Sequence, residues 1–580
     1  MSCQSQVSLL SMSHFTKIPL AQTIVDACLF YGVNQVVISP GSRNAPLTIG
    51  FTNEADIDHY SIVDERCAAF FALGMAQQTR KPVALVCTSG SAMLNYYPAV
   101  AEAFYSQIPL VVISADRPPH LIDRGDGQTI RQPEALDNHV GYSASLMLDN
   151  RNGDNTSNQS YNEHQLKKAF ATLSQRNIPI HINAPFDEPL YEQADEKQFQ
   201  PLFETLDVSS SQLLDTSDFL TQWNQAKRKM ILVGCLYPGR LSKEWIEYLA
   251  ADASVIVLTE ATSNLHHTNF FEQIDALIAP IEKLDNTDAF WQKLQPELLL
   301  TFGGMIVSKK IKAFLRKYPP KRHFHVDPFH ANDTFFCLSK HFKTTIDDFF
   351  NSHKNQLKYV TSDYQKFWLQ YKSVIENELS QYLEQIDHSD FSVFDRVIKR
   401  IPEDYLVHFA NSSSIRYANL FSFKNSHEVF SNRGTSGIDG STSTAIGAAL
   451  MSEKPGLLIT GDLSFFYDSN ALWNDHIPYD FKVIVINNSG GGIFRILPGE
   501  KEKAYYQRYF ETTHQLTAEH LCKMYGFEYH YADNEGELDQ CLSDFFLKND
   551  QPQLLEIKTP RTVNDEVLLG YFSFLADRCF

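Results

Sequence analysis

The stretch that decides the fold is GLLITGDLSFFYDSNALWNDHIPYDFKVIVINNSGGGIF, residues 456–494. One apolar run ends at Gly461-Asp462, a helical segment follows, and a second apolar run ends at Asn487-Asn488. This pattern predicts two parallel strands, and the carboxyl ends of parallel strands form the edge of the sheet where α/β proteins bind ligands.

Asp462 and Asn488 are therefore expected to lie close together as oxygen ligands, and the Gly490 carbonyl could supply another. Mg²⁺ prefers such ligands and keeps part of its octahedral shell for phosphate oxygens. The glycines at 490–492 would let the backbone approach a ligand closely. Taken alone, Asp462 is better explained as a helix cap and the glycine run as an ordinary turn.

Similar apolar, β-branched runs alternate with helical segments along the chain, which is typical of parallel α/β domains. The predicted strands are 34–39, 83–88, 109–114, 178–185, 229–234, 254–259, 298–304, 323–327, 405–411, 456–462, 481–488 and 553–559. An acidic, Gln-rich linker is expected at 186–215, and a charged, aromatic helical region lies near 350–390. The sequence predicts three α/β domains, at 1–190, 215–350 and 375–580.

Composition narrows the class of protein. Of 580 residues, 43% are hydrophobic and 21% charged, which is ordinary for a soluble globular protein. No apolar run reaches about 18 residues and the N-terminus lacks a secretory pattern, so we expect a cytoplasmic protein without a membrane span. The net charge of −19 argues against nucleic-acid binding and requires local Arg or Lys for any anionic substrate. The nine cysteines form no CxxC pair, which argues against a zinc site or a disulfide framework.

A second signal lies in SIVDERCAAFFALGMAQQTRKP, residues 61–82. Glu65 stands at the start of an apolar helix rich in Ala and Gly. The simplest explanation is that Glu65 or Asp64 complements the helix dipole in the first turn. A carboxyl group in an apolar pocket would instead have a raised pKa and could hold a proton for a ligand.

The paired strand ends resemble the binding motif of the thiamine diphosphate (ThDP) enzyme family, and Glu65 resembles that family's pyrimidine-binding glutamate. The resemblance implies ThDP and Mg²⁺, with Mn²⁺ as a possible substitute. Asp462, Asn488 and Gly490 would hold the metal on the diphosphate, and Glu65 would contact the aminopyrimidine as the catalytic carboxyl group. Leu463 stands where the general motif has glycine. Because this family binds the two ends of ThDP on different subunits, a homodimer or a dimer of dimers is expected.

Longer strings resemble one branch, the MenD family, or 2-succinyl-5-enolpyruvyl-6-hydroxy-3-cyclohexene-1-carboxylate (SEPHCHC) synthases. They are ISPGSRNAPLTIG, CTSGSAMLNYYPAVAEAFYSQIPLVVISADRPP, SNRGTSGIDGSTSTAIGAA and INNSGGGIFRILP. The similarity is dense over 38–132 and 405–500 and thin over 190–300. It implies three α/β domains that bind the pyrimidine, form the centre and bind the diphosphate. It also implies decarboxylation of 2-oxoglutarate and addition of the succinyl unit to isochorismate, with release of CO₂, in menaquinone biosynthesis.

Both expected substrates are dicarboxylates, which arginine binds well through two parallel hydrogen bonds. The resemblance assigns substrate contacts to Arg43, Arg117, Arg416, Arg433 and Lys309, to the neutral partners Ser42, Gln128 and Ser412, and to the apolar Phe494 and Leu497. It assigns further cofactor contacts to Ile438, Gly491, Ile493 and Phe494. Arg416 with Ser412 is expected to bind 2-oxoglutarate, and Arg43, Arg117 and Lys309 to bind isochorismate. Each Arg taken alone is more simply a solvated or paired surface charge. Lys310 is an alternative to Lys309 for the substrate-binding lysine. Gly127 stands where the family commonly has Asn, just before Gln128.

Other functions remain as alternatives. The enzymatic one is another ThDP-dependent 2-oxoacid decarboxylase or an acetolactate-synthase-like carboligase. Such enzymes usually carry a flavin or nucleotide site or catalytic His pairs, and the pair His266-His267 lies away from the N-terminal motifs. A non-catalytic regulatory subunit of this fold would be expected to lack Glu65, Asp462 or Asn488. No GxGxxG follows a first strand, which argues against a Rossmann dehydrogenase.

Overall fold

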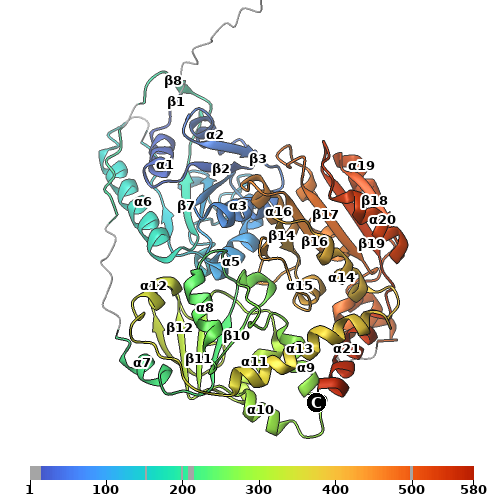
Figure 1. Cartoon of the computed structure of the whole chain (residues 1–580). Coiled ribbons are helices and arrows are strands. Elements are labelled where there is room, and N and C mark those ends of the chain that lie inside the picture. Colours follow the sequence, from blue (N-terminus) through green and yellow to red (C-terminus); the bar gives the residue numbers. More distant parts are fainter. Residues whose placement is uncertain (1–14, 151–152, 198–199, 207–214, 497–500, 580) are drawn as a thin grey trace, which may run out of the picture. The chain divides into compact units, whose positions relative to one another are not determined.

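The computed structural model describes residues 15–150, 153–197, 200–206, 215–496 and 501–579. The chain divides into two compact units. Unit 1 comprises Met1–Ser209 with Trp473–His476, and unit 2 comprises Ser210–Leu472 with Ile477–Phe580. Figure 1 shows sheets flanked by helices in both units.

Unit 1 is built on a six-stranded parallel sheet in the order β3-β2-β4-β5-β7-β6. Its strands are β2 (Gln35–Ile38), β3 (Asp58–Ser61), β4 (Val83–Cys87), β5 (Leu110–Asp116), β6 (Ser143–Ser145) and β7 (Ile180–Pro185). Its helices are α1 (Pro19–Phe30), α2 (Ala45–Thr52), α3 (Glu65–Thr79), α4 (Ala92–Asn95), α5 (Tyr97–Ser106) and α6 (Thr156–Arg176). A short antiparallel pair, β1 (Phe15–Thr16) with β8 (Gln193–Ala194), completes the unit.

The central strands of this sheet are buried on both faces, which explains their continuous apolar sequence. Every residue of β4, β5 and β7 is buried. The small residues of α3 allow the helix to pack closely, and its positions from Cys67 to Gln77 are all buried. The loop at Gly41 also approaches the sheet closely, because a Cβ there would lie 2.3 Å from the Thr88 side chain.

Unit 2 contains two parallel sheets. The five-stranded sheet has the order β10-β9-β11-β12-β13 and is formed by β9 (Lys229–Val233), β10 (Val255–Leu258), β11 (Leu298–Phe302), β12 (Arg322–Val326) and β13 (Leu338–Phe342). Its helices are α7 (Ser217–Trp223), α8 (Lys243–Ala251), α9 (Ile274–Ile281), α10 (Asp288–Leu294), α11 (Lys309–Lys317) and α12 (Ile346–Asn351).

The six-stranded sheet of unit 2 has the order β15-β14-β16-β17-β19-β18. Its strands are β14 (Leu406–Phe409), β15 (Glu428–Phe430), β16 (Gly456–Gly461), β17 (Lys482–Asn487), β18 (Glu528–Ala532) and β19 (Gln553–Lys558). The remaining helices are α13 (Tyr364–Leu383), α14 (Asp390–Arg400), α15 (Ser413–Ala418), α16 (Ser441–Leu450), α17 (Asp462–Tyr467), α18 (Ala504–Tyr506), α19 (Glu519–Tyr525), α20 (Glu535–Phe545) and α21 (Asn564–Cys579). One hydrophobic cluster joins residues of both sheets with α9, α13 and α21.

The predicted α/β class with three parallel sheets is confirmed, and each of the twelve predicted runs overlaps a strand. The domain boundaries 1–190, 215–350 and 375–580 stay a prediction.

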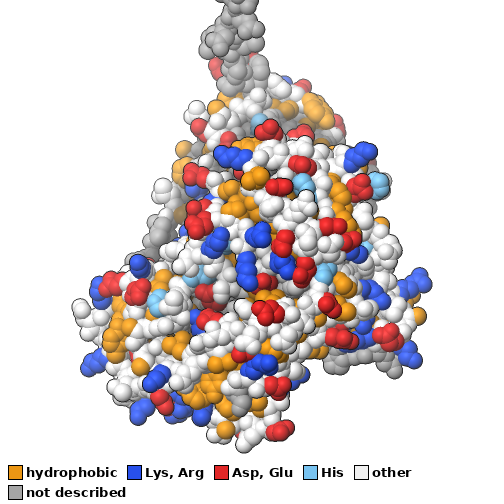
Figure 2. All heavy atoms as spheres, turned by 45° about the vertical axis from the view of Figure 1, so that its right-hand side comes forward, with side chains coloured by type: hydrophobic (Ala, Val, Ile, Leu, Met, Phe, Trp, Pro, Cys, Tyr) orange, Lys and Arg blue, Asp and Glu red, His pale blue; other side chains and the backbone are white. Residues whose placement is uncertain are grey.

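No helix in the described part of the chain is long and apolar enough to cross a membrane. Figure 2 shows a face on which positive and negative side chains are interspersed, without a large region of either sign.

A buried ion pair links the first residue of β9 to the residue that follows α8. Lys229 Nζ lies 2.8 Å from Asp252 Oδ2, and neither side chain is exposed. The ammonium also lies 4.5 Å from the centre of the Trp223 ring. Burial lowers the pKa of Lys229, and the Asp252 carboxylate opposes this shift.

We expect Asp252→Ala to destabilise unit 2 strongly, because an unpaired buried ammonium costs about 3–5 kcal/mol. The measurement is the denaturant midpoint of the first unfolding transition. Glu244→Ala is the matched control, since the Glu244–Lys354 pair is more than half exposed and is worth about 0–1 kcal/mol. Equal shifts for the two variants would contradict this explanation.

Candidate functional site

The edge formed by β16 and β17 brings the two parts of the predicted metal motif together. The strands pair in parallel with Gly461 beside Ile486. Asp462 follows directly and is buried. Its Oδ2 accepts a hydrogen bond from the Gly490 N–H at 2.9 Å, across 28 residues of sequence, and its Oδ1 accepts one from the Leu463 N–H at 2.6 Å. Oδ1, which has this one donor, therefore keeps a further acceptor site.

The two asparagines at the end of β17 have different environments. Asn487 uses both ends of its amide: Nδ2 donates to Glu556, and Oδ1 accepts from the Ser489 N–H at 3.0 Å. Asn488 Nδ2 donates to Asp390 Oδ2 at 3.0 Å, whereas its Oδ1 accepts no hydrogen bond from the described residues. The second asparagine is therefore the one with an oxygen available for a cation.

Glycine is required where the chain turns after β17. Gly490 has a φ of +147°, and a Cβ there would lie 2.5 Å from the Glu511 carbonyl oxygen. The Gly491 N–H donates to the same carbonyl at 2.6 Å. The Glu511 side chain is held by Arg495 at 3.0 Å and by Arg561 at 2.7 Å. Arg495, which lies in the string that follows the glycines, thus supports this loop.

Apolar side chains lie near this edge. Ile438 is 37% exposed, and its carbonyl accepts a hydrogen bond from Ser464 Oγ of α17 at 2.7 Å. Ile493 and Phe494 are partly buried, and the Phe494 ring packs edge to face on Phe510 at 5.9 Å. Leu497 lies outside the described residues.

These residues fit a diphosphate cofactor with a divalent cation. A buried carboxylate and an unoccupied amide oxygen provide hard ligands, and the exposed Ile438 provides an apolar contact for a ring. No group of three or more His, Cys, Asp or Glu suited to a metal occurs among the described residues, so a cation here would need phosphate and solvent oxygens as well. His514 Nε2 lies 3.2 Å from Asp462 Oδ2.

A cationic cluster in unit 2 contains Arg416 and Arg433. Ser412, which caps α15, has a φ of 70°, a strained conformation for a non-glycine residue. Arg416 lies one turn later and has no hydrogen bond or ion pair to the described residues. Burial lowers its pKa, with Asp275 raising it and Arg433 lowering it further. Arg433 donates to Asn411 Oδ1 at 2.5 Å, while its Nε has no partner.

Buried carboxylates lie near these arginines. Glu260 accepts hydrogen bonds from the Val307 and Ser308 N–H groups, each at 2.7 Å, and burial raises its pKa to about 7. Burial also raises the pKa of Asp275, which accepts from Ser308 Oγ. These acids therefore hold the start of α11 rather than neutralise the arginines by direct contact.

The predicted substrate lysine begins α11. Lys309 is exposed and forms no ion pair with the described residues, whereas Lys310 pairs with Glu282. Of the two neighbouring lysines, Lys309 is therefore the one whose ammonium group has no acidic partner among the described residues.

Glu65 lies at the start of α3 in unit 1 and is half-buried. The helix cap is provided by Asp64, whose side chain accepts from the Cys67 N–H at 3.2 Å. Glu65 Oε2 accepts a long hydrogen bond, 3.4 Å, from Asn95 Nδ2. The capping role considered for either acid thus falls to Asp64, which leaves the Glu65 carboxyl group for another contact.

The predicted substrate residues of unit 1 differ in how far their charges are paired. Arg43 is buried and donates to the Phe186 carbonyl at 3.0 Å and to Glu188 at 3.1 Å. Burial lowers its pKa, and the nearby Arg117 lowers it further. Arg117 Nε has no partner. Ser42 and Gln128 are exposed on loops.

Two comparisons with known proteins agree with these motifs. Residues 18–136 match the thiamine pyrophosphate enzyme N-terminal TPP binding domain, and residues 411–557 match the C-terminal TPP binding domain. Proteins named 2-succinyl-5-enolpyruvyl-6-hydroxy-3-cyclohexene-1-carboxylate synthase are similar over nearly the whole chain. That of Christiangramia forsetii is 51% identical over 573 residues, covering 97% of this chain and 99% of its own. That of Flavobacterium psychrophilum is 52% identical over 561 residues, covering 97% and 100%. That of Porphyromonas gingivalis is 36% identical over 572 residues, covering 96% and 97%.

The chain belongs to the SEPHCHC synthase family. It is a ThDP-dependent enzyme, and the resemblance of its motifs to this family is confirmed. The roles of the individual site residues stay a prediction.

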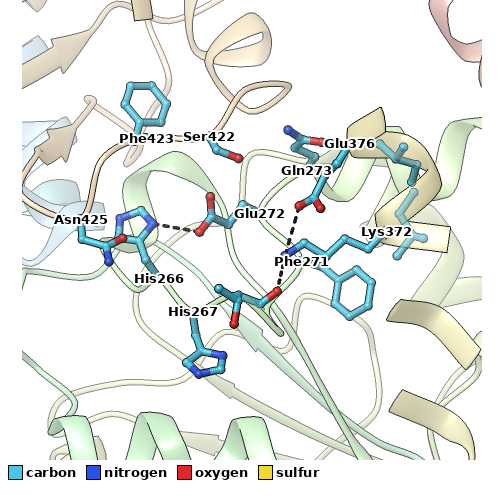
Figure 3. A pocket seen from close by; sticks show the side chains of 13 residues that line it. His266, His267, Phe271, Glu272, Gln273, Lys372, Glu376, Ser422, Phe423 and Asn425 are labelled. Carbon is cyan, nitrogen blue, oxygen red and sulfur yellow. Dashed lines mark hydrogen bonds and ion pairs between the residues drawn. The ribbon is translucent and has the colours of Figure 1, made fainter. Parts of the chain in front are cut away.

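A separate cavity of about 210 Å³ lies in unit 2 (Figure 3) and contains none of the predicted residues of this synthase family. Its charged groups pair with one another: His266 with Glu272 at 3.0 Å, and Lys372 with Glu376 at 3.3 Å. Lys372 also donates to the Thr268 carbonyl at 2.5 Å. The cavity therefore offers little unpaired charge to a ligand.

Three polar residues at the site were not predicted from sequence: Asp390, Asn411 and His514. Asn411 Nδ2 donates to the Asn432 and Gly437 carbonyls, each at 2.7 Å, and so holds the loop that carries Arg433. A usable signal existed for Asn411, because it follows β14 as Asn488 follows β17. Asp390 and His514 have no such local signal and are found only through their contacts.

Asp462→Ala is expected to weaken Mg²⁺-dependent ThDP binding by about 2–5 kcal/mol, about 30-fold or more, because the cation loses its charged ligand. Asp462→Asn, which keeps an acceptor for the Gly490 N–H, should be weakened as well. Calorimetric titration of ThDP at saturating Mg²⁺ measures the effect. Asp544→Asn, an exposed acid on α20, is the control. Unchanged ThDP affinity in both Asp462 variants would rule out the ligand role.

Proposed function

We propose that this chain decarboxylates 2-oxoglutarate and adds the succinyl unit to isochorismate, forming SEPHCHC and CO₂ in menaquinone biosynthesis. The carbon atoms balance, because the five of 2-oxoglutarate and the ten of isochorismate give the fourteen of SEPHCHC and the one of CO₂. The observation that carries the proposal is the hydrogen bond from the Gly490 N–H to Asp462, next to the Asn488 oxygen that no described donor uses. It occurs in a chain similar over 97% of its length to a named synthase.

When bound, ThDP supplies the carbon nucleophile that remains after the 2-oxo acid has lost CO₂. Asp462, Asn488 and the Gly490 carbonyl would hold Mg²⁺, or Mn²⁺ in its place, and the metal would bind the diphosphate. Ile438, Gly491, Ile493 and Phe494 would line the rings. These assignments agree with the acceptor capacity and exposure of the side chains involved.

The carboxyl group of Glu65 would hold a proton at N1′ of the aminopyrimidine. This role is supported by the freedom of Glu65 from the capping contact that Asp64 makes. Cover by a second subunit would exclude water from this half-buried carboxyl group and strengthen its hydrogen bond to the cofactor. A homodimer or a dimer of dimers is therefore part of the proposal.

Arg416 and Ser412 would bind 2-oxoglutarate. Arg416 carries a charge with no acceptor among the described residues, and a carboxylate is the ligand that such a partly buried guanidinium binds best. Arg433 would add a second positive charge.

Arg43, Arg117 and Lys309 would bind isochorismate, with Ser42 and Gln128 as neutral partners. Arg117 and Lys309 have the more available charges. Arg43 is held by Glu188 and the Phe186 carbonyl. It would therefore act mainly by electrostatic attraction and by a hydrogen bond from its Nε–H, which has no partner.

The test is incubation of the protein with ThDP, Mg²⁺, 2-oxoglutarate and isochorismate. Isochorismate is expected to disappear in step with CO₂ release. Pyruvate replaces 2-oxoglutarate in a parallel reaction. Release of CO₂ from pyruvate without consumption of isochorismate would overturn the proposal in favour of a different 2-oxoacid decarboxylase or carboligase.

Glu65→Gln should retain the fold and ThDP binding but lower turnover by about 10²–10⁴-fold, since an amide cannot hold the proton at N1′. Steady-state rates at saturating ThDP measure this, with circular dichroism as the check of folding. Asp58→Asn, an exposed acid of β3, should be unaffected. Turnover of Glu65→Gln close to wild type would exclude the assigned role.

Arg416→Ala should raise KM for 2-oxoglutarate by about 30-fold or more, because a lost charged partner in a partly dry site costs about 2–5 kcal/mol. Arg416→Lys should restore binding only in part, since an ammonium lacks the planar pair of donors. ThDP affinity should stay unchanged. Arg400→Ala is the control, because Arg400 forms a surface pair with Asp539 at 3.6 Å. KM values within about twofold of wild type for both acids would make Arg416 structural.

A further inference from the structure

The first residue of α14, Asp390, contacts the side chain that the metal site needs. Asp390 and Asn488 are both buried and lie 98 residues apart in sequence. We infer that Asp390 is a positioning residue that orients the Asn488 amide so that its carbonyl oxygen faces the cation. This inference rests on the proposed metal site and assigns to it a residue outside the ThDP motif.

The orientation of an asparagine amide follows from the groups around it. A carboxylate can only accept hydrogen bonds, so the partner of Asp390 Oδ2 at 3.0 Å must be the Asn488 amino group. The Asn488 carbonyl oxygen then points away from Asp390. The reversed amide would place two oxygens about 3 Å apart in a buried site, where repulsion and a lost hydrogen bond together cost about 1–3 kcal/mol or more.

Asp390 is itself fixed by neighbouring elements. Thr559 Oγ1, just after β19, donates to Asp390 Oδ1 at 2.6 Å. The Asp390 N–H donates to Asn564 Oδ1, at the start of α21, at 2.8 Å. No Lys or Arg among the described residues forms an ion pair with Asp390. Both carboxylate oxygens are thus held by neutral donors in one orientation, which is what an orienting group requires.

A comparison with the adjacent asparagine supports a specific role. Glu556 holds Asn487 in a similar way, but the Asn487 carbonyl oxygen already accepts from the Ser489 N–H at 3.0 Å. Fixing Asn487 therefore shapes the turn. Fixing Asn488 instead leaves an oriented oxygen that no described donor uses. Groups that orient metal ligands typically change metal affinity by about 10–100-fold when replaced.

The decisive experiment titrates Mg²⁺, and separately Mn²⁺, into full-length protein with saturating ThDP, followed by calorimetry. Asp390→Asn should weaken the cation affinity by about 10–100-fold, because the new amide also permits the reversed Asn488. High Mg²⁺ should restore ThDP binding in this variant. Asp395→Asn is the matched control, since Asp395 lies on the same helix, is buried to a similar extent and pairs with Lys399 at 2.8 Å.

Two further variants make every outcome decisive. Thr559→Val, which removes the donor to Asp390 but keeps its shape, should give a smaller loss and replaces Asp390→Asn if that variant does not fold. Asp462→Asn reports on the metal site itself. If Asp462→Asn loses cation binding while Asp390→Asn and Thr559→Val stay within about twofold of wild type, this inference is overturned and the metal site stands. If Asp462→Asn also binds normally, the proposed metal site fails.

Discussion

The parallel pairing of β16 with β17 is the constraint on which the candidate site depends. Because Gly461 lies beside Ile486, the residues that follow each strand emerge at the same edge of the sheet. Asp462 can then accept the Gly490 N–H, and the Asn488 oxygen lies at the same edge. A shift of register by one residue would move these side chains to the other face of the sheet. Both strands are buried on both faces, so the polar residues that end each run are the ones that a shift would displace.

Burying polar groups at this edge requires that nearly every one of them has a hydrogen-bond partner. The structure meets this requirement with acids placed behind the motif. Asp390 and Glu556 hold the two asparagines, and Glu511, paired with Arg495 and Arg561, supports the glycine turn. The oxygens left without a donor are therefore few, and a preorganised cation site is one in which those few converge.

In the three parallel sheets the sequence predicted the interior strands but missed β3, β6, β13, β15 and β18; the short pair β1 and β8 was also missed. All five lie at the edges of their sheets. An edge strand is covered on fewer sides, so polar residues interrupt its apolar run: in β3, DHYS, no position is fully buried, and β18, EYHYA, has one. Only β10, the sixth edge strand, keeps a continuous apolar run, VIVL, and it was predicted.

The same distinction applies to the site. That Asp462 and Gly490 meet at one edge of the sheet could be predicted because the signal is local, a polar group at the end of an apolar run. Asp390 could not, since its partner lies 98 residues away and nothing in FSVFDRV near it indicates a ligand. The pairing of Arg43 with Glu188 could not be predicted either, because the two residues are 145 apart in the sequence. Contacts between distant segments depend on the packing of whole elements, which local patterns do not specify.

Whether an arginine is paired with an acid also depends on contacts between distant segments. A chain of net charge −19 has abundant acids with which to neutralise them, and on exposed surfaces it does so, as for Arg396 with Glu535 and Asp539. Arg416 lacks such a partner although Asp275 and Glu260 are near, because Ser308 and the backbone at the start of α11 occupy those carboxylates. Burial disfavours the charge of Arg416 and lowers its pKa. An incoming carboxylate removes that penalty without first having to displace an internal partner. The acids that hold α11 thereby leave Arg416 without a direct ion pair among the described residues, which is the condition that the proposed carboxylate contact requires.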